Sequence, residues 1–401
     1  MYENLSILAA FVFLYSVVAG RLERTPINGA LVFTAFGLAL GPMGFGLLHL
    51  NVDTEGLRSL AELTLALVLF ADASNANLGV LEHSIRVPRR LLLVGLPLTI
   101  LLGVGVGVLV FDGLGLLEIA ILATMLAPTD AALGEAVVTA KSVPSKIREG
   151  LNVESGLNDG ICVPILFVFL ALVAGTNAHG STGALALHLL AEEIGIGIAV
   201  GIALTLAGAL LLKQCDGRGW VSETWRQLPV VALAMACFAL AQTLGGSGFI
   251  AAFAGGLLFG WLAKSRKHAL LLAAEGTGDT LALLTWVVFG AGMVGQAVAG
   301  FSWTIVLYAV LSLTVVRMLP VFLALSGTGL RNDEKLFIGW FGPRGLASIV
   351  FIVIVLGENL PGAQTLASVV VCTVVLSIIG HGLSANALVA ALARRSKPTG
   401  L

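Results

Sequence analysis

A group of polar side chains interrupts an apolar stretch near residue 155. Glu154, Ser155, Asn158 and Asp159 lie in the run Glu154-Ser155-Gly156-Leu157-Asn158-Asp159-Gly160. On a helix, Ser155 and Asp159 share one face, and Glu154 and Asn158 share the adjoining face, because residues four apart are neighbours. A carboxylate, a hydroxyl and carbonyls without helical partners are hard oxygen ligands, which suit a monovalent or other hard cation better than zinc or copper. The run therefore predicts a cation site whose carboxylate can also carry a proton.

Proline interrupts two other apolar segments, at positions that correspond if the chain is divided into two halves. Pro128 lies in Ala127-Pro128-Thr129-Asp130, and Pro343 lies in Gly342-Pro343-Arg344-Gly345. Proline leaves carbonyls without helical partners, and such backbone at membrane depth is tolerated only where protein or water satisfies it. Paired interrupted helices in inverted halves indicate the midplane site of a transporter. The break at Pro128 could instead be a simple helix kink.

Three further charged residues, Asp130, Arg317 and Arg344, lie inside apolar segments. A charge at the bilayer centre costs about 2.5–3.5 kcal/mol on insertion scales, so each is a candidate functional residue. Glu154 and Arg317 could alternatively form a neutralising structural pair with no role in transport. We expect His381 and His188 to be hydrogen-bonded core histidines rather than pH sensors.

The composition indicates that membrane-spanning helices position these residues. Of the 401 residues, 58% are hydrophobic and only 11% are charged, whereas soluble domains carry about 25% charged residues. The net charge of -1 provides no basic surface for nucleic acid. The four cysteines stand singly, and no zinc, nucleophile-elbow or phosphate-loop motif is present. We therefore expect an all-α polytopic membrane protein with no cofactor and no enzymatic activity.

Thirteen segments are long and apolar enough to be membrane-spanning candidates. Nearly all the cations, 19 of the 22 lysines and arginines, lie in alternate loops and in the C-terminal tail. By the positive-inside rule, this places the N-terminus outside and the C-terminus in the cytoplasm, in the inner (plasma) membrane. The predicted segments are 5–20, 27–48, 58–80, 91–111, 114–140, 151–174, 184–213, 228–244, 247–263, 279–299, 301–325, 335–357 and 364–392.

Five motifs resemble those of the monovalent cation/proton antiporters, in the branch of the NhaP-type antiporters and the animal sodium/proton exchangers. They occur in the order typical of the family and extend over essentially the whole membrane chain. One departure is Asp72-Ala73-Ser74, where relatives often have Asp-Ala-Gly. The matching motifs are Ala127-Pro128-Thr129-Asp130-Ala131, Glu154-Ser155-Gly156-Leu157-Asn158-Asp159, Gly248-Phe249-Ile250-Ala251-Ala252-Phe253-Ala254-Gly255-Gly256, Arg317-Met318-Leu319-Pro320 and Gly342-Pro343-Arg344-Gly345.

The resemblance implies the NhaA-like antiporter fold, with inverted six-helix repeats and two crossed, broken helices, in a homodimer surrounded by membrane lipid. It implies a dimerisation domain (1–80 and 216–300), a core ion-transport domain (81–180 and 301–401) and a connecting helix (181–215). The implied cation and proton ligands are Asp159, Asp130, Ser155, Thr129 and Asn158. Glu154 would pair with Arg317, and Arg344 would place positive charge at the crossover.

We therefore expect exchange of Na⁺ or Li⁺ for H⁺, with cation and proton competing for Asp159. Relatives with two adjacent aspartates are associated with moving more protons than cations, and Asn158 stands at the first of these positions, so we expect electroneutral exchange. A K⁺/H⁺ exchanger on the same fold stays open, because oxygen ligands do not decide between the ions. A channel or sensor on this scaffold and an organic-anion symporter are less favoured functions.

Overall fold

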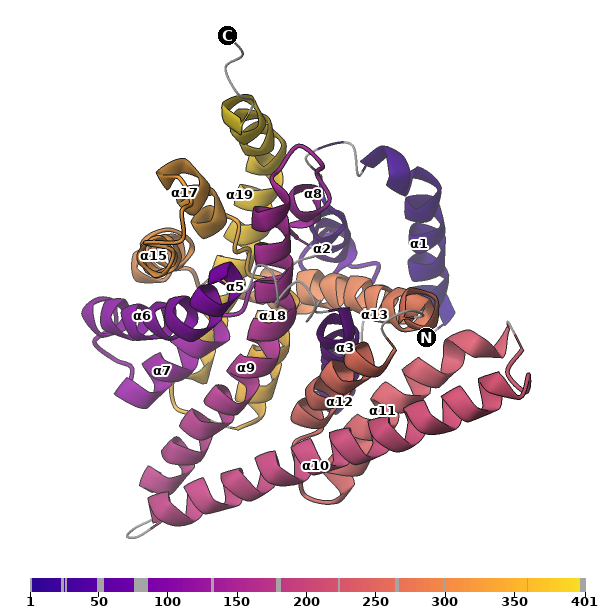
Figure 1. Cartoon of the computed structure of the whole chain (residues 1–401). Helices are drawn as coiled ribbons and strands as arrows, with labels where there is room; N and C mark the ends of the chain where they lie inside the picture. The colour runs from indigo at the N-terminus through magenta and orange to yellow at the C-terminus, as the bar shows by residue number, and fades with distance from the viewer. Residues whose placement is uncertain are drawn as a thin grey trace. The chain divides into compact units, whose positions relative to one another are not determined.

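The computed structural model (Figure 1) describes residues 2–22, 25, 27–48, 54–75, 86–130, 133–177, 182–222, 224–263, 267–298, 300–358 and 360–396. Within these ranges every regular element is a helix, which confirms the expected all-α class. The chain divides into two compact units, one formed by residues 1–58, 86–155 and 283–401 and the other by residues 59–85 and 156–282. The predicted division into dimerisation domain, core domain and connecting helix is a different one and stays a prediction.

The first unit contains the helices on both sides of the two proline breaks. They are α1 (Tyr2–Leu22), α2 (Gly29–Leu40), α5 (Arg86–Arg90), α6 (Leu96–Val110), α7 (Leu116–Met125), α8 (Glu135–Val138), α14 (Gly295–Val298), α15 (Trp303–Leu313), α16 (Val315–Ala324), α17 (Asn332–Trp340), α18 (Leu346–Gly357) and α19 (Ala363–Ser396), with π-helical turns η1 (Leu91–Gly95) and η3 (Phe289–Val294).

Helix α18 forms the centre of this unit. Each residue from Leu346 to Val355 is buried, and a helix that is apolar on all sides belongs in a core. An apolar cluster lies beside the break that precedes α18, with Val321 and Leu325 from the α16 region, Phe337 and Ile338 from α17, and Ala385 from α19 among its buried members. The C-terminal end of α17 is thus held by packing on several helices.

The second unit contains α10 (Thr182–Gly217), the 3₁₀ turn η2 (Trp225–Gln227), α11 (Leu228–Thr243) and α12 (Gly248–Leu262). Three helices cross the boundary between the units: α3 (Thr54–Asn75), α9 (Ser145–Asn177) and α13 (Lys267–Val288). A Cβ at Gly256 or Gly260 of α12 would meet the backbone of α3. Both glycines therefore let α12 pack closely against α3. The Ser74 hydroxyl, at the departure from the family pattern, lies 3.0 Å from the Gly256 carbonyl.

Helix occupies part of each of the thirteen predicted segments. Among the described residues, eight helices have the length and apolarity to cross a membrane, and four apolar helices are shorter. Helix α2 is shorter than predicted, because its C-cap Gly41 is extended and Pro42 follows. Segment 301–325 is divided at Thr314 into α15 and α16. That all thirteen segments cross the membrane stays a prediction.

Candidate functional site

Both proline motifs interrupt helices of the first unit. Helix α7 ends at Met125, and residues 127–130 are non-helical; helix α17 ends at Trp340, and α18 begins only at Leu346. The alternative of a simple kink at Pro128 is therefore wrong, because the helix ends before the proline. The Asp130 N–H donates to the Pro343 carbonyl at 2.8 Å. The two breaks thus contact each other through their backbones.

Each break contributes one charged side chain to the other. Asp130 Oδ2 accepts a hydrogen bond from the N–H of Leu346, the first residue of α18, at 3.0 Å. Arg344 Nη1 donates to the carbonyls of Ala127 (2.6 Å) and Pro128 (2.9 Å), just beyond the end of α7. A carboxylate is favourable at a helix N-terminus and a cation is favourable at a C-terminus. Asp130 and Arg344 therefore satisfy backbone N–H and C=O groups that the breaks leave without helical partners.

Two glycines permit this close approach. A Cβ on Gly345 would meet the carboxylate and the Cβ atom of Asp130. A Cβ on Gly342 would meet the guanidinium of Arg317 and, at 3.0 Å, the Cγ2 atom of Thr129. Both glycines lie in one of the family motifs, but the sequence alone indicated no role for either of them.

Further contacts secure the two breaks. The Ser348 hydroxyl of α18 donates to the Met125 carbonyl at 2.7 Å. On α19, Ser377 Oγ accepts from the Arg344 N–H at 2.7 Å, and His381 Nε2 lies 2.8 Å from the Trp340 carbonyl. These three side chains were not predicted as site residues, although the four-residue spacing of Ser377 and His381 in an apolar helix was a usable signal.

His188 and His381, the two histidines expected in the core, differ in burial. His381 is buried, and its Nδ1 lies 2.9 Å from the Ser377 carbonyl. The expectation of a hydrogen-bonded core histidine is therefore confirmed for His381. His188 of α10 is exposed, so that expectation is wrong for His188.

Glu154 of α9 and Arg317 of α16 form a buried bidentate ion pair. Arg317 Nη1 donates to Oε1 at 2.6 Å, and Nη2 donates to Oε2 at 2.8 Å. Both side chains are at most 2% exposed. Two parallel N–H···O bonds fix geometry as well as charge. The pair therefore holds α9 against α16 within the first unit.

Three of the predicted ligands lie together around a small cavity of about 10 Å³. A water molecule needs about 10–15 Å³ of such space, so the cavity is close to the size of one water molecule or one small cation. The Ser155 hydroxyl donates to the Thr129 carbonyl. The cavity is lined by Thr129, Asp130, Gly134, Val137, Val138, Leu151, Ser155, Phe341 and Pro343.

Asn158 and Asp159 follow on the same helix and belong to the second unit. Both are buried, and Asp159 stands four residues after Ser155 on continuous helix. Glycines flank the pair: a Cβ on Gly156 would lie 3.2 Å from the Asp72 carbonyl of α3, and one on Gly160 would meet the ring of Phe253. Gly156 therefore permits a close approach of the α3 backbone, whereas the neighbour of Gly160 is a side chain.

The oxygen chemistry of these residues suits a monovalent cation. Carboxylate, hydroxyl and carbonyl oxygens are hard ligands. Over the described part of the chain, no three His, Cys, Asp or Glu side chains gather as they do in a transition-metal site.

A family of known proteins matches this chain over almost its full length. The family described as "sodium/hydrogen exchanger, transmembrane" matches residues 7–391. The chain belongs to this family.

The chain is similar to antiporters of bacteria and yeast. It is 25% identical over 381 residues to the K⁺/H⁺ antiporter NhaP2 of Shewanella sp. (strain ANA-3), covering 94% of this chain and 64% of the relative. It is 25% identical over 297 residues to the Na⁺/H⁺ antiporter of Schizosaccharomyces pombe, covering 70% of this chain and 63% of the relative. This chain thus spans just under two thirds of the length of these relatives.

The fold matches a solved structure, that of the sodium proton antiporter MjNhaP1 from Methanocaldococcus jannaschii at pH 8. The TM-score is 0.78 at 20% identity, and the match covers 95% of this chain and 99% of that one. This exchanger-family chain therefore has the fold of a polytopic membrane antiporter.

Proposed function

We propose that this protein is a secondary transporter that exchanges a monovalent cation for H⁺. The observation that carries the proposal is the small cavity lined by Thr129, Asp130 and Ser155. It lies where each helix break places a charged side chain against the backbone of the other. Interrupted helices with free backbone groups are typical of the ion sites of secondary transporters. Membership of the exchanger family supports the same function.

In this proposal Asp159 alternately carries the cation and the proton. It is a buried carboxylate placed one helical turn beyond Ser155. Thr129, Asp130, Ser155 and Asn158 supply further oxygens during part of the cycle. Because each ligand must leave before the other binds, alternating access at a single carboxylate couples cation movement to proton movement.

The transported cation is proposed to be Na⁺ or Li⁺. K⁺ is the second candidate, because the relatives that match 94% of this chain carry the name K⁺/H⁺ antiporter NhaP2. An oxygen site discriminates between these ions by its size and rigidity rather than by its residue types.

The larger assembly follows from the same family resemblance. We propose thirteen spans as two inverted six-helix repeats with crossed breaks, in a plasma-membrane homodimer with the N-terminus outside and the C-terminus in the cytoplasm. The dimerisation parts are 1–80 and 216–300, the core parts are 81–180 and 301–401, and residues 181–215 connect them.

The test uses purified protein in liposomes with an imposed pH gradient and a pH-sensitive dye. Na⁺, Li⁺, K⁺ and choline are added one at a time, and dequenching measures proton movement. Saturable dequenching with Na⁺ and Li⁺ supports the proposal, and a response to K⁺ alone favours the second candidate. Absence of a response to every alkali cation, from protein that is folded and correctly inserted, contradicts cation/proton exchange.

A further inference from the structure

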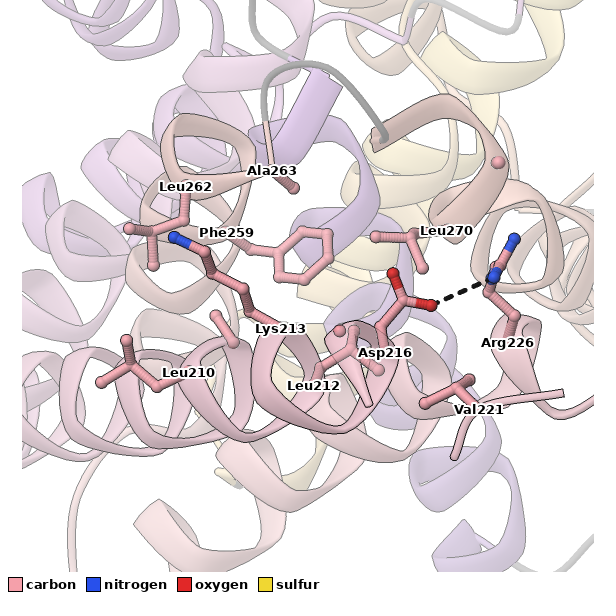
Figure 2. Close-up of a pocket in the computed structure, with 13 residues that line it drawn as sticks. Leu210, Leu212, Lys213, Asp216, Val221, Arg226, Phe259, Leu262, Ala263 and Leu270 are labelled. Carbon is pink, nitrogen blue, oxygen red and sulfur yellow. Dashed lines mark hydrogen bonds and ion pairs between the residues drawn. The ribbon is translucent and has the colours of Figure 1, made fainter. Parts of the chain in front are cut away.

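A second cavity lies in the second unit, apart from the candidate ion site. Its volume is about 1100 Å³, slightly above the range of about 300–1,000 Å³ typical of small-molecule pockets. Helices α10, α12 and α13 and the segment between α10 and α11 form its walls (Figure 2). The lining residues are Ala209, Leu210, Leu212, Lys213, Asp216, Gly217, Val221, Arg226, Phe259, Leu262, Ala263, Ala269 and Leu270.

The lining changes from apolar to charged along α10. Ala209 and Leu210 come first, and Lys213 and Asp216 follow at its C-terminal end. Figure 2 shows the side chains of Lys213 and Asp216 extending from α10 to the side where Phe259 and Leu270 lie. One wall of the cavity is thus apolar and the adjoining wall is ionic, as required by an amphiphilic ligand.

The charged wall carries a net positive charge. Arg226 Nη2 forms an ion pair with Asp216 Oδ1 at 3.0 Å, and Arg226 is partly exposed. Lys213 is exposed and has no ion-pair partner among the described residues. The formal charges of Lys213, Asp216 and Arg226 therefore sum to +1. The exposed Nζ group of Lys213 is available to an anion.

The position of the cavity relative to the bilayer follows from the cation pattern. Lys213, Arg218 and Arg226 form one of the cation-rich loops that the positive-inside rule assigns to the cytoplasm. Basic pockets between transmembrane helices on this side recognise the headgroups of anionic lipids. A lipid can use both walls, whereas a small water-soluble anion would leave the apolar wall of Phe259, Leu262 and Leu270 uncovered.

We propose that this cavity binds an anionic phospholipid of the cytoplasmic leaflet. Lys213 and the outer face of Arg226 contact the phosphate, and an acyl chain packs along Phe259, Leu262 and Leu270. None of these residues belongs to the candidate ion site. The lipid thus bridges α10, α12 and α13 and stabilises the second unit.

Thermal stability of the delipidated, detergent-solubilised protein tests the proposal. Phosphatidylglycerol, phosphatidylcholine of the same acyl chains and sn-glycerol 3-phosphate are titrated separately. Only phosphatidylglycerol should raise Tm in a saturable manner. Lys213→Gln should weaken its apparent affinity about fivefold, because one cation near a lipid surface contributes about that factor. Ala209→Trp should abolish the saturable shift by filling the cavity while keeping its charges.

Arg394→Gln is the matched control. Arg394 is an exposed cation at the C-terminal end of α19 and does not line the cavity, so this variant should respond like the wild type. Equal shifts with phosphatidylcholine would overturn the proposal in favour of unspecific filling by apolar chains. A shift with sn-glycerol 3-phosphate would indicate a simple anion site. The absence of any saturable shift would also contradict a lipid site. So would an altered oligomeric mass of the Ala209→Trp variant, because that result would make this face an interface between copies of the chain.

Discussion

Asp130 Oδ2 accepts a hydrogen bond from the Leu346 N–H, so a carboxylate from one helix break caps the helix that begins after the other. Arg344 makes the reciprocal contact with the carbonyl of Ala127. Both interactions place the favourable sign of charge at a helix end. Because the breaks depend on each other, a change to one side chain should disturb both of them.

Gly345→Ala should abolish transport while the protein still inserts into the membrane. The added Cβ would meet the Asp130 carboxylate, which has little room to move because it caps α18. Gly105→Ala in α6 is the matched control, since its Cβ would meet no atom within 4 Å. That control should keep full activity and gain up to about 1 kcal/mol in helix stability. Equal activity of the two variants in proteoliposomes would contradict a tight contact at Gly345.

Glu154→Gln and Arg317→Ala should each lower thermal stability in detergent. Removing one partner of a buried ion pair commonly costs about 3–5 kcal/mol, because the other charge stays buried without compensation. The double variant should lose less than the sum of the two single losses. Additive losses in this double-mutant cycle would show that the pair is not energetically coupled.

Asp333→Asn should destabilise the protein at neutral pH but not at strongly acidic pH. The hydrogen bond from the Arg331 guanidinium to the Asp333 carboxylate is the main reason that the pKa of Asp333 lies below its usual value. Such a carboxylate contributes its full stability above the unfolded-state pKa of about 3.9 and loses it as pH falls through the lower folded-state value. The side chains are partly exposed, so the effect on Tm should be only about 1–2 °C.

The check is a Tm series between pH 7 and pH 3 for both proteins. Their difference should shrink toward the acidic end, as the carboxylate becomes protonated. It should be smaller in an Arg331→Gln background, where Arg395 still lies 3.9 Å from the Asp333 carboxylate. A difference that does not shrink between pH 7 and pH 3 would assign the stabilisation to something other than the ionised carboxylate.

Exchange should be electroneutral. Asn158 replaces one proton carrier, and Arg317 holds Glu154 in an ion pair. Asp130 sits at a helix N-terminus that favours negative charge. One H⁺ then moves against one cation, so membrane potential, worth about 2.3 kcal/mol per charge per 100 mV, has no leverage on the equilibrium.

Proteoliposomes with clamped potassium–valinomycin potentials and no pH gradient measure this directly. The equilibrium cation distribution should not change with voltage, although the initial rate can. Cation accumulation that follows the imposed potential would show electrogenic exchange.

The sequence could predict those parts of the candidate site that consist of anomalous residues in apolar segments. Charges such as Asp130 and Arg317 are too costly in a membrane to be incidental, and two prolines mark the helix breaks. The partners of the breaks, including Ser348, Ser377 and His381, could not be predicted, because hydroxyl and imidazole groups in apolar helices are common and their targets are backbone atoms far away in the chain.

The need for Gly342 and Gly345 likewise depends on which side chains approach them in space. The early end of α2 was readable from Gly41-Pro42, whereas the division of α15 from α16 at Thr314 had no comparable signal.

The central claim is that one carboxylate, Asp159, carries the cation and the proton in turn. The most direct measurement compares wild type with Asp159→Asn in proteoliposomes, after gel filtration has shown that both proteins are folded and have the same oligomeric mass. The wild type should exchange Na⁺ for H⁺ with an apparent cation affinity that weakens as pH falls, because protons compete for the site. The Asp159→Asn variant should show no cation-dependent proton movement at any pH. Exchange by this variant at close to the wild-type rate would contradict the account.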